Sequence, residues 1–247
     1  MKISDAFWEK RNLGVTCYEL QLELADKPEA VAKELDDLEE RQYMVARIPS
    51  SCCGLVQLFQ NRGYSFAEAA IMLENDLRKF HSKKFEIPPK LQKICGRCSW
   101  RAMNETELLQ LSEEIHKNIF QTDRVYLDPE FTSEQAAQRY EYWTRDLMRQ
   151  GAVPYKVVMN GEIVGFFLNR EIEPHVFDGL LAAAYREYAG SGMGYCIQYA
   201  GIMHALEQGG IRYLGHVSGN NPAVLKILLS IGFSIKKLEY VFVKHNS

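Results

Sequence analysis

The sequence has no long hydrophobic run, no excess of basic residues and few cysteines, and each shortage excludes a class of protein. No apolar stretch approaches the roughly 20 residues that a helix needs to cross a bilayer, so we expect no membrane-spanning segment. The formal net charge of −3 argues against a dedicated nucleic-acid-binding protein, which normally has a basic face. Residues 1–10 lack the hydrophobic core of a signal peptide, and we therefore expect a cytoplasmic protein.

The six cysteines predict neither a disulfide framework nor a metal site. A disulfide framework is typical of short exported chains, whereas this chain has 247 residues and no export signal. Cys95 and Cys98 form a C-x-x-C pair, but no second such pair and no histidine pair at zinc spacing accompanies them. We therefore expect free thiols near a linker, and no metal ion.

A linker is predicted over residues 80–93, where Lys83-Lys84 is followed by Pro88-Pro89. The hydrophobic content of 47% and the charged content of 25% are those of an ordinary globular protein, and the length suits one large or two modest domains. The linker divides the chain into a first domain, residues 1–90, and a second, residues 91–247.

Strands and helices alternate in the first part. The period of the apolar residues predicts strands over 15–24, 43–48 and 66–73, and helices over 28–40 and 55–61.

The second part begins with two helices, each with a capping box: Asn104 with Glu107, and Thr132 with Gln135. Asn160-Gly161 then joins two strand-like runs and predicts a type I′ hairpin. Further strands are predicted over 176–184, 212–217 and 238–243, with helices over 195–207 and from Asn221-Pro222 to the residue before Gly232.

Residues 189–194 form a glycine-rich turn between a predicted strand and a predicted helix. Such a turn leaves backbone N–H groups unpaired at the positive end of a helix dipole, which suits a phosphate or pyrophosphate.

An internal repeat relates the two parts. Gly63-Tyr64-Ser65-Phe66 aligns with Gly232-Phe233-Ser234-Ile235 at an offset of 169 residues, and the same offset superposes predicted strands on strands and helix on helix. The identities are few, so either a duplicated αβ unit or chance explains the match.

Two motifs of the second part resemble those of the GNAT superfamily of acyl-CoA-dependent N-acyltransferases. They are residues 187–194, which hold the glycine turn, and residues 221–233, which run from Asn221 to Gly232-Phe233. The resemblance covers residues 100–244 and implies a mixed α/β, GNAT-like fold with a central, mostly antiparallel sheet flanked by helices. The smaller N-terminal αβ domain would then resemble a partial GNAT repeat.

The same resemblance implies acetyl-CoA as the cosubstrate. In the family, the turn binds the pyrophosphate through backbone amides, the asparagine contacts the cofactor near its pantetheine arm, and a backbone N–H before the turn polarises the thioester carbonyl. The residues at these positions here are Ala183 and Ala184, then Ala189, Gly190, Ser191, Gly192, Met193 and Gly194, and finally Asn221. Lys226 could meet a CoA phosphate, or it is an ordinary exposed lysine.

Residues 124–131 and 139–143 resemble one subgroup of that superfamily, the dTDP-fucosamine acetyltransferases. Members acetylate a 4-amino sugar on a nucleotide and carry an additional N-terminal half-domain. The aromatic cluster Tyr140, Tyr142 and Trp143 is expected in the core, with a sugar-stacking platform as the alternative.

The sequence departs from the family at two positions. Ala189 stands where arginine or glutamine is common, and Leu228 stands where many members have a tyrosine that protonates the leaving thiolate. Leucine cannot donate a proton, so another group does so or the alignment of this helix is off.

The candidate catalytic residues are Asp178, His216 and Tyr240. Acyl transfer needs an uncharged amine, which Asp178 or His216 could supply as a general base, while Tyr240 could replace Leu228 as a proton donor. Other candidates are His175, Glu171 and Glu173 as bases and Tyr188 as a donor. For each, a solvated loop charge, a surface histidine or an alternating strand aromatic is the alternative interpretation.

We therefore expect an acetyl-CoA-dependent N-acetyltransferase that transfers the acetyl group directly to the amine of an amino sugar, free or nucleotide-linked. The alternatives are a GNAT enzyme acting on another small amine, an amino acid or a peptide, and an acyl-CoA-binding module without turnover. We expect a small-molecule partner, neither nucleic acid nor membrane, and a monomer or homodimer.

Overall fold

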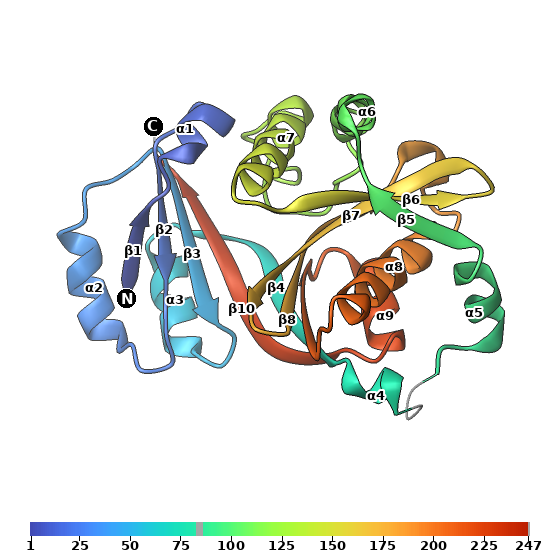
Figure 1. Cartoon of the computed structure of the whole chain (residues 1–247). Helices are drawn as coiled ribbons and strands as arrows, with labels where there is room; N and C mark the ends of the chain where they lie inside the picture. Colours follow the sequence, from blue (N-terminus) through green and yellow to red (C-terminus); the bar gives the residue numbers. More distant parts are fainter. Residues whose placement is uncertain (83–85, 247) are drawn as a thin grey trace.

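The computed structural model describes residues 1–82 and 86–246, and within them ten strands form one sheet (Figure 1). Their order across the sheet is β1-β2-β3-β10-β4-β9-β8-β7-β6-β5. The strands are β1 (Lys2–Asp5), β2 (Cys17–Gln21), β3 (Tyr43–Pro49), β4 (Ser65–Asp76), β5 (Cys98–Ala102), β6 (Val153–Met159), β7 (Glu162–Glu173), β8 (Val176–Ala184), β9 (Arg212–Ser218) and β10 (Ser234–His245).

The sheet is mostly antiparallel, as expected. Only the β2–β3 and β8–β9 pairs are parallel among the described strands. Both parts of the chain build it together, because β10 lies between β3 and β4 while β4 lies between β10 and β9. The division into domains near residue 90 stays a prediction.

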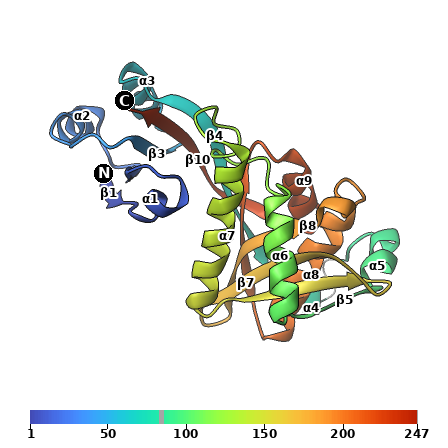
Figure 2. The same ribbon diagram turned by 90° about the horizontal axis from the view of Figure 1, so that it is seen from above.

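Helices cover both faces of the sheet (Figures 1 and 2). On one face, α6 (Glu105–His116) and α7 (Ser133–Arg149) pack through Leu111 and Tyr140 against Phe166 of β7, and α1 (Trp8–Asn12) lies beside α7. On the other face, α8 (Met193–Glu207) covers β7 and β8, α9 (Pro222–Ser230) covers β9, and α2 (Pro28–Asp36) and α3 (Cys53–Asn61) cover β2 and β3. The mixed α/β architecture is that expected from the sequence.

The strongest local signals of the sequence are confirmed. The side chains of Asn104 and Thr132 each accept a hydrogen bond from the backbone N–H three residues later. The side chains of Glu107 and Gln135 in turn accept one from the backbone N–H of Asn104 and Thr132. Asn160 and Gly161 have φ values of 52° and 90°, as a type I′ turn requires.

The predicted linker is more regular than expected. Pro88-Pro89 does not block structure, because Pro89 is the first residue of α5 (Pro89–Cys95), where proline is tolerated. The helix α4 (Arg78–His81) precedes it, and Lys83-Lys84 lies outside the described residues. The sequence did not predict β1, α1 or β5, which are short elements with weak apolar periodicity.

The internal repeat is visible in the fold. Adding 169 to the bounds of β3, α3 and β4 gives the bounds of β9, α9 and β10. The pairing has the same symmetry: Pro49 faces Glu239, and the equivalent Ser218 faces Ala70. The two units are therefore related by an approximate twofold axis between β10 and β4.

Within the described ranges, no helix combines the length and apolar character that crossing a membrane would require.

Candidate active site

The parallel strands β8 and β9 part from each other in the middle of the sheet. They pair from Val176 with Arg212 to Gly179 with Gly215, and beyond this point β8 pairs only with β7. A bulge lies at the same place, because Asn169 faces Gly179 while the neighbouring Leu168 faces Leu181. Leu180 is thus the extra residue on β8, and the edge of β8 that follows it is free.

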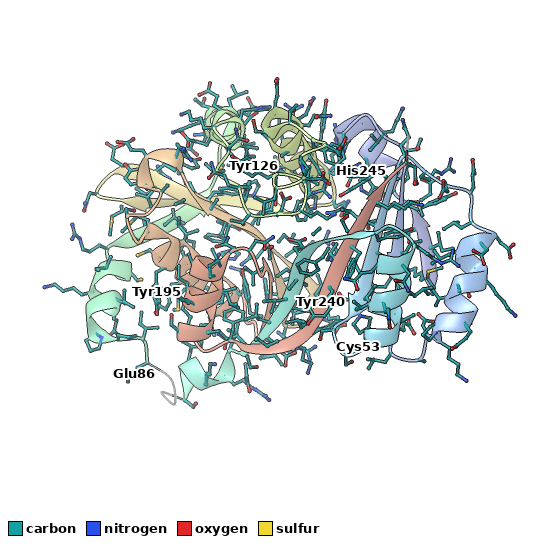
Figure 3. All side chains as sticks on the ribbon, turned by 180° about the vertical axis from the view of Figure 1, so that it is seen from behind. Cys53, Glu86, Tyr126, Tyr195, Tyr240 and His245 are labelled. Carbon is teal, nitrogen blue, oxygen red and sulfur yellow. The ribbon has the colours of Figure 1, made fainter. Side chains whose placement is uncertain are left out.

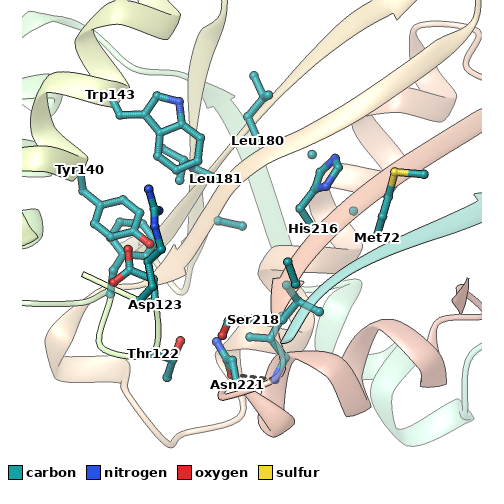
Figure 4. A pocket seen from close by; sticks show the side chains of 18 of the residues that line it. Met72, Thr122, Asp123, Tyr140, Trp143, Leu180, Leu181, His216, Ser218 and Asn221 are labelled. Carbon is teal, nitrogen blue, oxygen red and sulfur yellow. Dashed lines mark hydrogen bonds between the residues drawn. The ribbon is translucent and has the colours of Figure 1, made fainter. Parts of the chain in front are cut away.

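A cavity of about 1200 Å³ passes through the sheet where the two strands part. On one face it is lined by Ile197 and Gln198 of α8 and by Asn221 and Leu228 of α9. On the other face it is lined by Tyr140 and Trp143 of α7 (Figure 4). It extends along the sheet to Arg47 of β3. A ligand can therefore approach the gap from either face.

The glycine turn, residues 189–194, lies at the surface where α8 begins, and its residues are not part of the cavity lining. Gly190 and Gly192 have φ values of 76° and 88°, a conformation that favours glycine. A Cβ atom at either would meet no other atom within 4 Å, so the space above the turn is open. Within the described part of the chain, no acceptor is found for the N–H groups of Gly190, Gly192 and Gly194. Open space and free donors at the start of α8 fit an anionic phosphate.

The other expected cofactor residues lie around the same gap. Asn221 lines the cavity; its Oδ1 accepts a hydrogen bond from Val224 N at 3.1 Å, which leaves its Nδ2 to donate to a ligand. Ala183 and Ala184 are on the free edge of β8. Lys226 is exposed on α9 outside the cavity lining, and buried Leu228 lines the cavity.

Two of the candidate catalytic residues, Asp178 and His216, lie together. Asp178 on β8 and His216 on β9 are on the same face, and His216 Nε2 is 3.0 Å from Asp178 Oδ1. The distance is that of an ion pair, although the relative orientation of the two groups is not that of a hydrogen bond. The His216 side chain is half-exposed and lines the cavity, whereas Asp178 lies behind it.

Tyr240 lies on the opposite face of the sheet. It packs with the apolar side chains under α3 and makes an edge-on ring contact with Phe66 (Figure 3). It does not line the cavity, and Tyr188 does not either. This placement gives no support to either tyrosine as a proton donor.

The remaining candidate bases sit at the turn between β7 and β8. Glu171 accepts a hydrogen bond from His175 N at 2.7 Å, and His175 Nδ1 lies 3.0 Å from the Gly209 carbonyl oxygen. Both side chains and that of Glu173 are exposed and outside the cavity lining. They fit the alternative interpretation of solvated loop charges.

The far end of the cavity is lined by charged residues that the sequence did not single out. Arg47 of β3 and Glu68 of β4 project from the same face as Lys237 and Glu239 of β10, since their positions are paired or two residues apart in the ladders. Their periodicity is that of strand residues, and only the sheet register shows that they meet.

Aromatic side chains enclose the middle of the cavity. Tyr140 is buried and stacks on Phe120, whereas Trp143 is partly exposed; both line the cavity under α7. Tyr213 lines it where β8 and β9 part, with its ring against Gly179, and burial raises its pKa well above the ordinary value.

The cysteines form a small cluster away from this site. Cys95 Sγ is 3.4 Å from Cys196 Sγ on α8, and all six cysteines are free thiols. Among the described residues, no group of three or more side chains could hold a metal ion.

Comparison with known proteins identifies the fold of the chain through solved structures alone. No family model matches the sequence, and no curated protein matches it. Solved structures do match. A GCN5-related N-acetyltransferase from Sphaerobacter thermophilus superposes with a TM-score of 0.54 at 14% identity, over 82% of this chain and 59% of that one. This chain therefore spans less than two thirds of the length of that protein.

Two further structures agree. A tandem GNAT protein from the clavulanic acid biosynthesis pathway gives a TM-score of 0.56 at 14% identity, over 88% of this chain and 68% of that one. A GCN5-related glucosamine N-acetyltransferase region of a fungal multi-domain β-N-acetylglucosaminidase gives a TM-score of 0.63 at 12% identity. The match covers 93% of this chain and 30% of that one. The chain has the GNAT fold in a two-part arrangement; the likeness to dTDP-fucosamine acetyltransferases stays a prediction.

Proposed function

We propose that this protein is an acetyl-CoA-dependent N-acetyltransferase that acts on the amine of an amino sugar. The observation that carries the proposal is the cavity that passes through the sheet where β8 and β9 part. Such a passage lets a thioester enter from the side of α8 and α9 while an amine enters from the side of α7. Direct transfer between two bound substrates needs this arrangement.

The residues around the passage fit acetyl-CoA. The free N–H groups of the glycine turn and the dipole of α8 suit its pyrophosphate, and Asn221 Nδ2 can donate to a polar group of the pantetheine arm. The bulge at Leu180 and the free edge of β8 supply backbone N–H groups for the thioester carbonyl oxygen.

His216 is the residue that we assign to proton transfer. With the proton on Nε2, held beside the Asp178 carboxylate, Nδ1 keeps a lone pair that can accept a proton from the attacking amine. The resulting imidazolium can return that proton to the thiolate as it leaves, which removes the need for a tyrosine at Leu228.

An amino sugar is the acceptor that we favour. The acceptor side of the cavity is lined by Tyr140 and Trp143 and by polar and charged side chains, a mixture that suits a ring with hydroxyl groups. One structure of the same fold is a glucosamine N-acetyltransferase region by name, which is consistent with this choice. We expect a small-molecule acceptor and a cytoplasmic monomer or homodimer.

The test is a calorimetric titration with acetyl-CoA, followed by a thiol-release assay over a panel of amino sugars, amino acids and simple amines. We expect acetyl-CoA to bind and thiol release to be fastest with an amino sugar. Activity on amino acids with none on amino sugars would overturn the acceptor assignment.

A second candidate function is an acyl-CoA-binding module without turnover. The observation that favours it is Leu228, which lines the cavity where a proton-donating tyrosine is expected. Tight binding of acetyl-CoA without thiol release for any amine in the panel would support this function over the first.

A further inference from the structure

At the far end of the cavity, among the residues that the structure describes, the charged side chains of Glu68 and Arg47 form no ion pair. Glu68 is only 6% exposed, and its Oε2 atom is buried without a hydrogen-bond partner. It forms no ion pair with any residue of the described chain. A buried carboxylate without an ion-pair partner is costly, and because the Glu68 side chain lines the cavity, a ligand group that donates hydrogen bonds to it would offset this cost.

Two arginines beside Glu68 are also incompletely bonded. Arg47 lines the same cavity, and its guanidinium group has no ion-pair or hydrogen-bond partner among the residues that the structure describes. Burial and the nearby Arg124 lower the pKa of Arg47, against the raising effect of Glu19 and Glu68. Arg124 contacts Glu19 at 3.3 Å through one terminal nitrogen, but its Nε is buried without a partner.

The charges at this end of the cavity cancel. Three cationic side chains are matched by three carboxylates; all six line the cavity, and they are Arg47, Arg124, Lys237, Glu19, Glu68 and Glu239. Lys237 is paired with Glu239 at 2.8 Å. A ligand group with several negative charges would face three carboxylates here, whereas an uncharged group with both donors and acceptors suits the open positions. Hydroxyl groups have this property, because each can donate to Glu68 and accept from an arginine.

This end is distant from the reacting end. In the internal repeat, Arg47 is the equivalent of His216, and Glu68 is the equivalent of Lys237. Arg47 and His216 therefore lie on opposite sides of the approximate twofold axis. β3 is the third strand from β9, which places it about 14 Å away at ordinary strand spacing. An acceptor that reaches both ends is longer than a single sugar ring.

We propose that Arg47, Glu68 and Arg124 bind an uncharged, hydroxyl-rich unit of the acceptor, beyond the ring that carries the reacting amine. The acceptor is then an amino sugar joined to a second sugar, and not to a nucleotide diphosphate. This inference rests on the proposed acetyltransferase function and assigns the N-terminal part to acceptor recognition.

The test compares three acceptors: glucosamine, a disaccharide of two β-1,4-linked glucosamine units, and a nucleotide-linked amino sugar. We expect kcat/KM for the disaccharide to exceed that for glucosamine about tenfold or more, the gain that one well-placed set of polar contacts supplies. Glu68→Gln and Arg47→Gln should remove most of this preference by raising KM for the disaccharide, with little change for glucosamine. Glu74→Gln, the same substitution farther along β4 and outside the cavity lining, is the matched control.

A preference for the nucleotide-linked sugar, or an unchanged disaccharide KM in Glu68→Gln, would overturn the inference. Thermal melting and the acetyl-CoA Kd of each variant show whether it is folded. A separate titration with the fully N-acetylated disaccharide measures binding without turnover: wild type should bind it and Glu68→Gln should bind it at least tenfold more weakly. Failure of wild type to bind acetyl-CoA would refute the proposed function, whereas failure to bind the disaccharide would refute this inference alone.

Discussion

At the residue scale, the proposed chemistry rests on the pairing of His216 with Asp178. The imidazole lines the cavity and the carboxylate lies behind it, at 3.0 Å from Nε2. A carboxylate at this distance places a negative charge beside the ring, on the side away from the proposed reacting groups. Neither residue stands out by its neighbours in the chain; the parallel register of β8 and β9 places them together.

We predict that His216→Gln lowers kcat by about 100-fold or more, because general-base catalysis contributes that much or more in enzymes. The acetyl-CoA Kd should stay within error, since the cofactor residues lie elsewhere around the gap. Steady-state thiol release and calorimetry measure the two quantities. His175→Gln is the matched control at the exposed β7–β8 turn, and equal losses in both variants would contradict the assignment.

A second residue-scale feature is the buried ion pair between Glu9 of α1 and Arg139 of α7. Glu9 is fully buried and accepts hydrogen bonds from Arg139 Nε and Nη2 at 2.9 and 2.8 Å. Removing one partner of a buried pair costs about 3–5 kcal/mol, whereas an exposed pair contributes about 0–1 kcal/mol. We therefore predict that Arg139→Met destabilises the fold far more than Arg11→Gln, which breaks the more exposed pair with Asp146. Urea unfolding of both variants measures the difference, and similar losses would contradict it.

The same pair predicts a dependence of stability on pH. Burial raises the pKa of Glu9, but the charges and hydrogen bonds of Arg139 outweigh it and hold the pKa below its ordinary value. A lowered pKa in the folded state contributes stability above the ordinary glutamate value, and the contribution is lost as pH falls through the folded value. We expect the free energy of unfolding to fall below about pH 4, and Glu9→Gln to flatten this acid limb. An acid limb of unchanged slope in that variant would show that other groups produce it.

At the element scale, the glycine turn before α8 is the part whose shape the sequence specifies most directly. Gly192 has a φ of 88°, and a side chain at this position would meet no neighbouring atom. The left-handed backbone conformation, and not a lack of space, therefore favours glycine here. No side chain caps the first turn of α8, so its backbone N–H groups stay free. At the starts of α6 and α7, in contrast, a capping side chain accepts a hydrogen bond from such a group.

We predict that Gly192→Ala weakens acetyl-CoA binding about tenfold, equivalent to about 1.4 kcal/mol, because alanine disfavours the left-handed conformation that presents the N–H groups. Gly161→Ala is the matched control: Gly161 has a φ of 90° and equally open space, but it lies in the β6–β7 hairpin. Both variants should lose about 1–2 kcal/mol of stability, and only the first should lose affinity in calorimetry. Equal acetyl-CoA Kd values for the two would contradict a role of the turn in binding.

Elements with strong local signals were predicted well. Capping side chains, the Asn-Gly turn and the helix begun by Asn221 act over a few residues, so the order of the chain is enough to place them. Pro88-Pro89 misled the prediction of the linker, because a proline at the first position of a helix and a proline that ends one have the same local sequence.

At the scale of the whole molecule, the two repeats differ in the parallel strand that lies beside each: β2 beside β3 in the first, and β8 beside β9 in the second. In the second, β8 leaves β9 after Gly179 and opens the passage. In the first, every residue of β2 pairs with β3, and Leu22 N continues the ladder with a hydrogen bond of 2.9 Å to the Arg47 carbonyl oxygen. No glycine occurs between β2 and α2, so the first repeat has neither the gap nor the turn. Its sheet face forms a wall of the cavity instead, through Glu19 of β2 and Arg47 of β3.

We predict that residues 1–90 do not fold by themselves. In that fragment β4 would have no neighbouring strand, because its partners β10 and β9 both lie in the rest of the chain. An unpaired strand leaves a row of backbone groups and a buried apolar face without partners. Circular dichroism and denaturant unfolding of the fragment should show no cooperative transition, and mixing it with residues 91–247 should restore one. Cooperative unfolding of the isolated fragment would contradict this prediction.

The sequence by itself determined what depends on neighbouring residues: the caps, the hairpin, the glycine turn and the offset of the repeat. The tertiary structure alone decided which distant side chains share a cavity. Asp178 meets His216, and Arg47 shares a sheet face with Glu68, only through strand order and register, while the connection between α6 and α7 brings Arg124 to the same cavity. Tyr240 and His216 show why. Each lies on a strand whose side chains alternate between the two faces of the sheet. The pairing of strands from both parts of the chain decides which face borders the cavity, and local periodicity does not encode this pairing.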